Sequence, residues 1–422
     1  MHVFNPLALV SSLLLASSSS SSLVAAAPPS ATWAERATST PGLPSTDPFY
    51  KYSGNLTSQA NGAILNSRAV TPVATNAAKA YQLLYKTTDA IGTPDATVVT
   101  ILVPKTPKAG APKIVGLQLP EDSVSIDCAP SAALANGTNS PAAQSLTTTS
   151  QGLEGSLQNG YYVVIPDHEG SKAQAFVGPT EGRATLDGLL AATAFPTAIP
   201  GVDRSTPIAI GGYSGGAHAT AWAAQLYSTG TASELNIRGQ VIGGTPVNLT
   251  STLLYLNKGS YLGFAIVGVA GEALAYPDIR DFITPNLYPN GTALFKDIQD
   301  NKCLLNVAFN ANYARKDLFS YFKLADPLSY PVPRKRLAEN LLGGDGSKLS
   351  IGTIMYHGEA DDVIPYQDAV KYAKSQCSKG AMVHFYSDPG AKHIQEEGSR
   401  GASFVQWLDD VLSGKADFSC NL

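Results

Sequence analysis

The sequence predicts an α/β protein in which helices cover both faces of a mostly parallel β-sheet. Short runs rich in β-branched residues alternate along the chain with longer segments of helical periodicity, and this alternation is typical of the class. Several of the short runs are apolar throughout, as expected for strands that are covered on both faces. The chain has 422 residues, of which 44% are apolar and 15% are charged, so it can bury a large core.

Residues 1–27 have the pattern of a secretory signal peptide. An apolar stretch from Leu7 to Leu15 is followed by a serine run and by small residues at 24–27, which suit a signal peptidase. The apolar stretch is too short to span a bilayer, so we expect a secreted, extracellular protein without a transmembrane segment. Four Asn-X-Thr sequons predict N-glycosylation, at Asn55, Asn136, Asn248 and Asn290.

Residues 28–60 are rich in Pro, Ser and Thr and lack periodicity, which predicts an extended lead-in. The alternation that follows predicts a core in two parts, 61–247 and 343–422. Strands are expected at 97–103, 113–119, 161–165, 208–211, 239–242, 351–356 and 382–386. Helices are expected at 75–87, 180–195, 216–228, 366–376 and 399–412.

Residues 248–342 lie between the two parts and contain helical pieces without a clear strand. This segment predicts a helical cap or lid inserted into the sheet protein. Its most apolar stretch, Tyr261 to Tyr276, is short for a membrane span and contains Glu272 and several glycines. A buried or lid helix is therefore the better interpretation of this stretch.

The charge balance of 29 basic against 33 acidic residues, without a basic cluster, argues against nucleic-acid binding. The sequence has no CxxC motif and no His/Cys cluster, so we expect no metal and no cofactor. Asp167-His168-Glu169 could be a metal site or a second acid/base pair, but we favour a structural network.

The four cysteines are expected to pair in an oxidising compartment, where three connectivities are possible. We favour Cys128 with Cys303 and Cys377 with Cys420. Unpaired buried thiols are the alternative.

The clearest chemical signal is the segment 208–218, where a strand pattern runs directly into a helical pattern. Gly212, Ser214 and Gly216 at this junction form a Gly-X-Ser-X-Gly elbow, a tight turn that projects the serine hydroxyl above the sheet. The helix N-terminus places a positive dipole beside this hydroxyl, and the Gly215 N–H can donate to an oxyanion. Ser214 is therefore the predicted nucleophile.

A serine nucleophile needs a base, which is expected late in the chain. His393 lies in a loop after the last predicted strand and before the final helix, where the order Ser, acid, His places the base. His218 and His384 are interpreted as structural, because one lies on the nucleophile helix and the other inside a strand. His168 and His357 each follow or end a strand.

The acid that orients the base should lie in the loop after the preceding strand. Glu359, Asp361 and Asp362 all lie there. We choose Asp361, with Asp362 next, to accept the Nδ1–H of His393 and to stabilise the imidazolium that forms during catalysis.

From Lys113 to Cys420, the chain resembles the fungal secretory lipase family, the lipase A-type α/β-hydrolases. The resemblance is carried by several blocks of sequence. One is the loop that contains Glu359, Asp361 and Asp362, which we call the acid loop. The others are 120–123, 127–130, 160–170, 212–216, 235–239, 243–247 and 376–381. The resemblance implies a triad of Ser214, Asp361 and His393 and a cap between nucleophile and acid. It also implies an oxyanion hole formed by Gly215 and Asp122, for which a solvated turn aspartate is the alternative.

The activity implied by the resemblance is hydrolysis of triacylglycerols through an acyl-enzyme, by a monomer that meets lipid or small ester substrates, including those at a lipid–water interface. The main alternative is a soluble-ester carboxylesterase or a deacetylase of fungal secondary metabolites. The family's type member continues past the second disulfide into a flap over the site, whereas this chain ends at Leu422. We therefore expect no flap, which favours the esterase alternative. An inactive binding protein and a protease are further alternatives.

Overall fold

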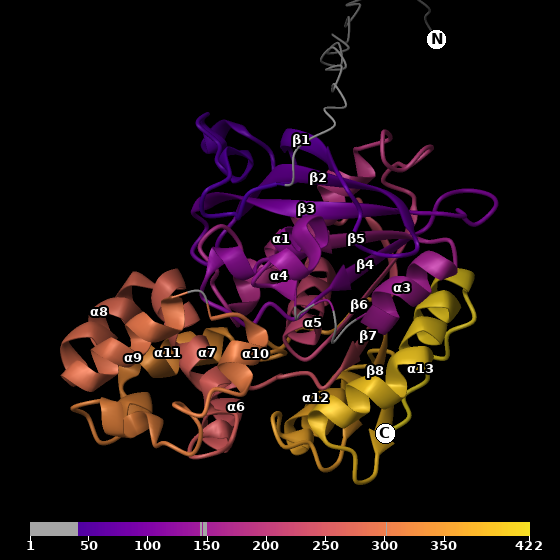
Figure 1. Cartoon of the computed structure of the whole chain (residues 1–422). Helices are drawn as coiled ribbons and strands as arrows, with labels where there is room; N and C mark the ends of the chain where they lie inside the picture. The colour runs from indigo at the N-terminus through magenta and orange to yellow at the C-terminus, as the bar shows by residue number, and fades with distance from the viewer. Residues whose placement is uncertain (1–40, 144–145, 147–149, 301) are drawn as a thin grey trace, which may run out of the picture. The chain divides into compact units, whose positions relative to one another are not determined.

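The computed structural model describes residues 41–143, 146, 150–300 and 302–422 (Figure 1). The predicted signal peptide and the lead-in up to residue 40 lie outside the described residues. The rest of the lead-in forms two short 3-10 helices, η1 (Pro48–Tyr50) and η2 (Leu56–Ser58). Phe49 of this segment is buried against Leu84 and Val98 of the sheet, so the lead-in packs onto the core.

The strands form one nine-stranded sheet in the order β1-β2-β3-β5-β4-β6-β7-β8-β9. Their bounds are β1 (Ile64–Val70), β2 (Ala77–Thr88), β3 (Pro94–Pro104), β4 (Ile114–Gln118), β5 (Tyr162–Pro166), β6 (Pro207–Tyr213), β7 (Asn236–Gly243), β8 (Gly352–Gly358) and β9 (Val383–Asp388). The pairings from β1 to β5 are antiparallel, and those from β5 to β9 are parallel. The predicted α/β class with a mostly parallel sheet is confirmed.

One predicted helix, 75–87, is wrong, because residues 77–87 lie in strand β2 instead. β2 pairs with β1 on one side and with β3 on the other. Tyr81, Leu83 and Tyr85 alternate along β2 and enter the same core cluster. This period of two is the strand signal, and pairing with distant strands outweighs the helix propensity of the Ala, Lys and Leu residues around it.

Helices cover both faces of the sheet. Helices α4 (Gly178–Thr193), α5 (Gly215–Ser228) and α12 (Tyr366–Ser378) pack their apolar residues into one core cluster. Helices α1 (Pro130–Asn136), α3 (Ser150–Gln158) and α13 (His393–Ser413) pack into a second cluster, on the other face. The short 3-10 helices η3 (Ile126–Cys128) and η4 (Gly137–Asn139) flank α1. The sequence analysis missed α1, α3 and β1.

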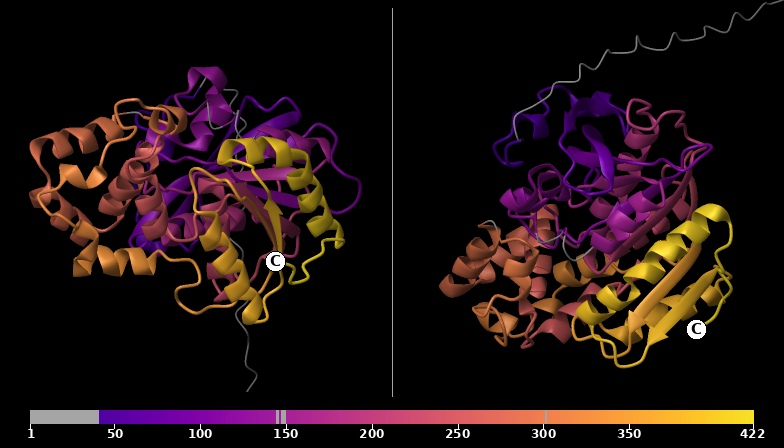
Figure 2. Two further views of the ribbon diagram at one scale, coloured as in Figure 1. Left: turned by 90° about the horizontal axis from the view of Figure 1, so that it is seen from below. Right: turned by 45° about the vertical axis from the view of Figure 1, so that its right-hand side comes forward.

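The inserted segment 248–342 is helical in its described residues, and we call it the cap. Its helices form a separate apolar cluster and lie together beside the sheet (Figures 1 and 2). They are α6 (Leu249–Leu256), α7 (Leu262–Ala275), α8 (Pro277–Asn286), α9 (Pro289–Gln299), α10 (Leu304–Ala308), η5 (Leu318–Tyr321), η6 (Pro327–Ser329) and α11 (Pro331–Glu339). The apolar stretch at 261–276 is thus a cap helix, and no helix in the described part of the chain is long and apolar enough to cross a membrane.

Two disulfides link distant parts of the chain. Cys128 pairs with Cys303, and Cys377 pairs with Cys420, which are the two pairs that the sequence analysis favoured. The first bond joins η3 of the core to the cap segment just before α10. The second joins the end of α12 to the C-terminal segment after α13.

Candidate active site

Four segments bring the predicted site residues together at one edge of the sheet. Asp122 follows β4, Ser214 follows β6, Asp361 follows β8 and His393 follows β9. These four strands belong to the parallel part, so their carboxyl ends lie at the same edge, where α/β sheets bind their ligands.

Ser214 lies in a strained turn between β6 and α5. Its φ of 55° and ψ of −123° are rare for a residue with a side chain. Its N–H donates to the carbonyl oxygen of Gly243 at 2.9 Å. A Cβ at Gly212 would lie 2.4 Å from the backbone of Gly216, and a Cβ at Gly216 would lie 2.1 Å from the carbonyl oxygen of Gln118. The two glycines of the elbow are therefore required by close packing.

Ser214, His393 and Asp361 form a continuous chain of hydrogen bonds. His393 Nε2 lies 2.8 Å from Ser214 Oγ, and His393 Nδ1 lies 2.7 Å from Asp361 Oδ2. His393 is the first residue of α13, not part of the loop before the final helix as predicted. Gly398 and Ser399 are weak helix formers, and they concealed the true start of this helix in the sequence.

The carboxylate of Asp361 is held by four polar contacts. Its Oδ1 accepts the backbone N–H groups of Val363 at 2.8 Å and Ile364 at 2.7 Å. Its Oδ2 lies 3.1 Å from His357 Nε2, in addition to its contact with His393. These contacts fix the orientation of the acid and therefore that of the base.

The environment favours a charged histidine beside an ionised aspartate. Burial alone would raise the pKa of Asp361, but His393 and His357 outweigh burial and hold this pKa below its usual range. Burial likewise opposes the charged form of His393, yet Asp361, Glu397 and Glu396 raise the pKa of its ring above the ordinary value. The arrangement therefore stabilises an imidazolium next to Ser214.

Asp122 lies directly against the elbow. A Cβ at Gly215 would lie 1.9 Å from Asp122 Oδ1, and Asp122 itself has a φ of 47°. The residue is 2% exposed, so its interpretation as a solvated turn aspartate is wrong. Burial and the charge of Glu181 raise the pKa of Asp122 to about 7, although His393 lowers it. Below that pH the carboxyl is mostly protonated and can donate a hydrogen bond.

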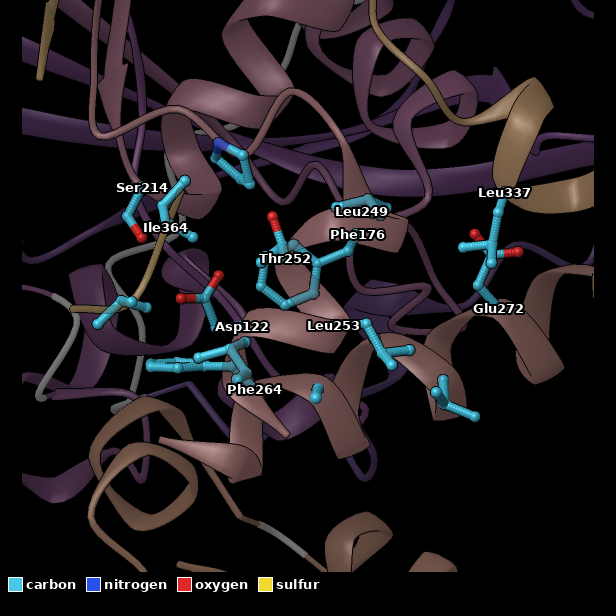
Figure 3. A pocket seen from close by; sticks show the side chains of 16 residues that line it. Asp122, Phe176, Ser214, Leu249, Thr252, Leu253, Phe264, Glu272, Leu337 and Ile364 are labelled. Carbon is cyan, nitrogen blue, oxygen red and sulfur yellow. The ribbon is translucent and has the colours of Figure 1, made fainter. Parts of the chain in front are cut away.

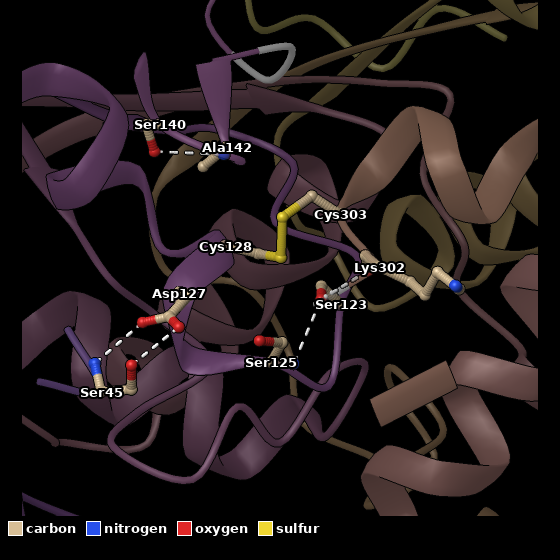
Figure 4. The surroundings of a disulfide bond; sticks show 9 residues. All are labelled: Ser45, Ser123, Ser125, Asp127, Cys128, Ser140, Ala142, Lys302 and Cys303. Atoms are coloured by element: carbon tan, nitrogen blue, oxygen red, sulfur yellow. Dashed lines mark hydrogen bonds between the residues drawn. A yellow bond between two sulfur atoms is a disulfide. The ribbon is translucent and has the colours of Figure 1, made fainter. Parts of the chain in front are cut away.

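The segment after Asp122 is fastened to the cap. Ser123 Oγ donates to the carbonyl oxygen of Lys302 at 2.9 Å, and the neighbouring Cys303 forms the disulfide with Cys128 (Figure 4). Two independent links thus connect the candidate oxyanion segment to the residues that precede α10.

The histidines predicted to be structural have structural partners. His218 Nδ1 lies 2.7 Å from Glu181 Oε2, and its Nε2 accepts from Trp222 Nε1–H at 3.1 Å. His384 lies within β9, with its ring centroid 4.5 Å from that of Tyr386. Neither side chain is part of the Ser214 hydrogen-bond chain.

The segment Asp167-His168-Glu169 is buried among protein groups. Asp167 accepts hydrogen bonds from the amide and the hydroxyl of Ser131. His168 Nε2 lies 2.9 Å from the carbonyl oxygen of Leu119. These are the contacts of a structural network, and in the described part of the chain no group of three or more His, Cys, Asp or Glu side chains could hold a metal ion.

The other two acidic candidates lie near the surface. Asp362 Oδ2 is 3.5 Å from Lys392 Nζ, and Glu359 is exposed. Asp361 is the acid that the structure brings to His393.

Three supporting residues escaped the sequence analysis as parts of the site. Tyr213 OH donates to the carbonyl oxygen of His393 at 2.7 Å. Glu396 accepts the N–H of Gly358, just before the acid loop, and His357 contacts Asp361 as described above. Tyr213 is the X residue of the elbow, so its position beside Ser214 was the one available signal.

A mostly apolar cavity begins at Ser214 and extends into the cap (Figure 3). It encloses about 590 Å³, including its open mouth. Its walls come mainly from α6, α7 and the acid loop, and include Leu249, Leu253, Phe264, Val269 and Ile364. A second hollow adjoins Ser214 and His393 and is lined by residues of α10 and the start of α13.

The sheet order, the serine elbow and the acid and histidine that follow β8 and β9 define an α/β-hydrolase with a serine at the nucleophile position. Comparisons with known proteins identify its family within this class. The family model described as secretory lipase matches residues 140–419. The chain is 36% identical over 363 residues to lipase A of Moesziomyces aphidis, an alignment that covers 84% of this chain and 77% of that protein.

Two further relatives agree. The secreted triacylglycerol lipase LIP4 of Malassezia globosa is 31% identical over 391 residues, which cover 90% of this chain and 84% of that protein. The crystal structure of Candida antarctica lipase A in its closed state matches with a TM-score of 0.84 at 34% identity, covering 90% of this chain and 88% of that one. The chain therefore belongs to the secretory lipase family, and it is a secreted lipase, a carboxylic ester hydrolase.

Proposed function

We propose that this lipase hydrolyses triacylglycerols through an acyl-enzyme formed on Ser214. The observation that carries the proposal is the hydrogen-bonded chain of Ser214, His393 and Asp361 at the mouth of an apolar cavity. A serine needs such a base to become nucleophilic, and an acyl chain needs an apolar wall along its length.

Ser214 Oγ attacks the ester carbonyl while His393 Nε2 accepts its proton. The same nitrogen then donates this proton to the leaving alcohol, and the acyl group stays on Ser214. A water molecule repeats the cycle and releases the fatty acid. Asp361 holds the ring in the correct tautomer and stabilises its charge at each step.

The oxyanion that forms on the carbonyl needs donors beside Ser214. We assign this role to the N–H of Gly215, at the N-terminus of α5, and to Asp122. The Asp122 carboxyl occupies the space that a Cβ of Gly215 would need, and this close packing supports the pairing. The pKa of Asp122, raised to about 7 by burial, allows its side chain to act as a neutral donor at acidic pH.

The test is the hydrolysis rate as a function of acyl-chain length, from acetyl to oleoyl esters, below and above the solubility limit of each substrate. Ser214→Ala serves as the blank. We expect activity on long chains, including emulsified triolein, and covalent labelling of Ser214 by a fluorophosphonate.

Activity confined to dissolved acetyl or butyryl esters would instead assign the chain as a carboxylesterase or deacetylase. A rate equal to that of the Ser214→Ala blank on every ester would contradict the proposal as a whole.

We also propose that residues 1–27 are removed as a signal peptide and that the four sequons carry glycans. Asn55 and Asn290 are exposed, and Asn136 and Asn248 are partly exposed. Mass spectrometry of the secreted protein before and after glycosidase treatment would check both points, and light scattering would check the expected monomer. A mature chain that begins at Met1 would exclude the signal peptide.

A further inference from the structure

The apolar cavity that begins at Ser214 ends at a buried acidic side chain, Glu272. Figure 3 shows Ser214 and Glu272 at opposite ends of the cavity. Glu272 also lines a third hollow, which is apolar and lies within the cap, together with Leu253, Val269 and Leu337. A carboxyl group in such surroundings is costly unless its oxygen atoms have partners.

Helix α7 leads from the reaction site to this carboxyl. Phe264, Gly268 and Glu272 line the cavity at intervals of four residues, so they lie on one face of the helix. Phe264 also lines the hollow that contains His393, which places this end of α7 near the reacting atoms. The eight residues from Phe264 to Glu272 span about 12 Å.

One oxygen of Glu272 has a partner inside the protein. Its Oε1 accepts from Asn340 Nδ2 at 2.7 Å. Asn340 is fully buried and is occupied on both sides, because Nδ2 also donates to the carbonyl oxygen of Phe176 and Oδ1 accepts the N–H of Gly178. This network joins the cap to the N-terminus of α4, and it accounts for the orientation of Oε1 toward Asn340.

The other carboxyl oxygen of Glu272, Oε2, has no such partner. Glu272 is 6% exposed, and within the described part of the chain no group forms a hydrogen bond with its Oε2. A glutamine would serve the contact with Asn340 equally well. Burial raises the pKa of Glu272 to about 7, although Asn340 and Arg336 lower it. Above this pH the carboxyl is mostly ionised, and Oε2 is a free acceptor.

Resting on the proposed function, we infer that Glu272 is a specificity-determining residue that accepts a hydrogen bond from a hydroxyl group near the far end of the acyl chain. The preferred substrates are then esters of chain-hydroxylated fatty acids. A site that hydrogen-bonds a substrate hydroxyl discriminates against the chain that lacks it, because the buried acceptor is then left unpaired.

The length of α7 sets the position of this hydroxyl. An extended chain advances by about 1.2 Å per bond, a third of the length of one extended residue. A span of about 12 Å along α7 therefore corresponds to about ten bonds. The hydroxyl should be recognised when it lies at least that far from the ester carbonyl.

The experiment compares kcat/KM for esters of plain fatty acids with those of the same acids hydroxylated at successive positions. We expect the distal hydroxyl to raise kcat/KM about tenfold, as one buried hydrogen bond allows, and a hydroxyl near the ester to lower it. The O-methyl ether of the preferred substrate cannot donate and should lose the gain.

Variants assign the effect to Glu272. Glu272→Leu should abolish the preference for the hydroxylated chain and accept the plain chain better. In Glu272→Gln the amide oxygen accepts from Asn340, and the remaining NH2 can only donate, so the hydroxylated chain should lose its advantage over its O-methyl ether. Glu339→Gln, which changes an exposed carboxyl on α11, should change nothing. The ether control makes the test independent of whether Glu272→Leu folds.

Measuring the binding of fatty acids without turnover tests the role of Glu272 separately from the proposed function. Calorimetry on Ser214→Ala should show tighter binding of the distally hydroxylated fatty acid than of the plain acid. Equal binding of the two acids, or a preference that survives in Glu272→Leu, would overturn the role of Glu272 even if plain esters are hydrolysed. Preferential binding without turnover in the unaltered enzyme would instead overturn the lipase proposal and keep the subsite.

Discussion

The edge of the sheet and the cap hold their functional groups by different means. At the sheet edge, directional contacts hold Ser214, His393 and Asp361, and Asp361 alone receives two backbone N–H groups and two imidazoles. In the cap, apolar side chains enclose the cavity, and Glu272 is its principal polar group. The difference indicates that single polar substitutions should abolish the chemistry, whereas changes of volume in the cap should alter substrate choice gradually.

The largest effect should come from Ser214→Ala. Removal of a triad serine lowers kcat by about 10⁶-fold in a serine hydrolase with this constellation. Burst kinetics and steady-state rates on a soluble ester would measure the loss, with thermal unfolding as a control for folding. A variant that retained a tenth of the activity would contradict the assignment of the nucleophile.

Asp361→Asn should lower kcat by about 10⁴-fold, because the amide favours the wrong tautomer of His393. It should also shift the acidic limb of the pH profile of kcat/KM to lower pH, since the carboxylate raises the pKa of His393 and the base must be neutral to act. Asp362→Asn is the matched control and should leave both quantities close to those of the unaltered enzyme.

A change of volume in the cap should act on the substrate and not on the chemistry. Leu253 lines the cavity, whereas its neighbour Leu254 is 53% exposed. Leu253→Phe should reduce the ratio of long-chain to acetyl-ester activity about tenfold, because the larger ring fills space needed by the acyl chain. Leu254→Phe should leave the ratio unchanged, and equal effects of the two variants would argue that acyl chains do not enter this cavity.

The smallest effect should be on stability, and both regions contribute to it. Burial first of all raises the pKa of Asp122 and Glu272 to about 7 and that of Glu396 to about 8. From about pH 4, where such groups titrate in the unfolded chain, up to these values, the folded protein binds more protons than the unfolded chain. Stability therefore falls as pH rises through this window.

Thermal unfolding should accordingly show a lower Tm at pH 8 than at pH 5. Asp361 works in the opposite direction only at low pH: its pKa is depressed in the folded state, so its contribution is lost below about pH 4. Glu272→Gln should flatten the slope slightly by removing the contribution of the cap. A Tm that rises from pH 5 to pH 8 would contradict this account of the buried carboxyls.

Much of the sheet could be predicted because the parallel strands are continuous apolar runs. The segment before Ser214 is one such run, and its junction with α5 has a local signature in Gly212 and Gly216. The antiparallel edge was harder, because β2 resembles a helix in composition and β1 is only partly buried. Their pairing depends on partners that are distant in the sequence and that local periodicity does not reveal.

In the site, too, some features follow from the local sequence and others depend on distant contacts. The order of serine, acid and histidine follows from topology, so Ser214 and His393 could be predicted from their places after strands. The contact of His357 with Asp361 and the burial of Asp122 depend on how loops fold over the sheet edge. The sequence carries no periodic signal for either, and Glu272 was noted only as a charge within an apolar stretch.

The disulfide between Cys128 and Cys303 has a mechanical consequence. It fastens the cap to the core at a point close in the chain to Asp122, while Ser123 and Lys302 tie the same two segments by a hydrogen bond. The attachment lies at the start of α10, which packs against the cavity helix α7, so any movement of the cap relative to the core is restrained close to the cavity. The same links keep the segment around Asp122 beside Ser214.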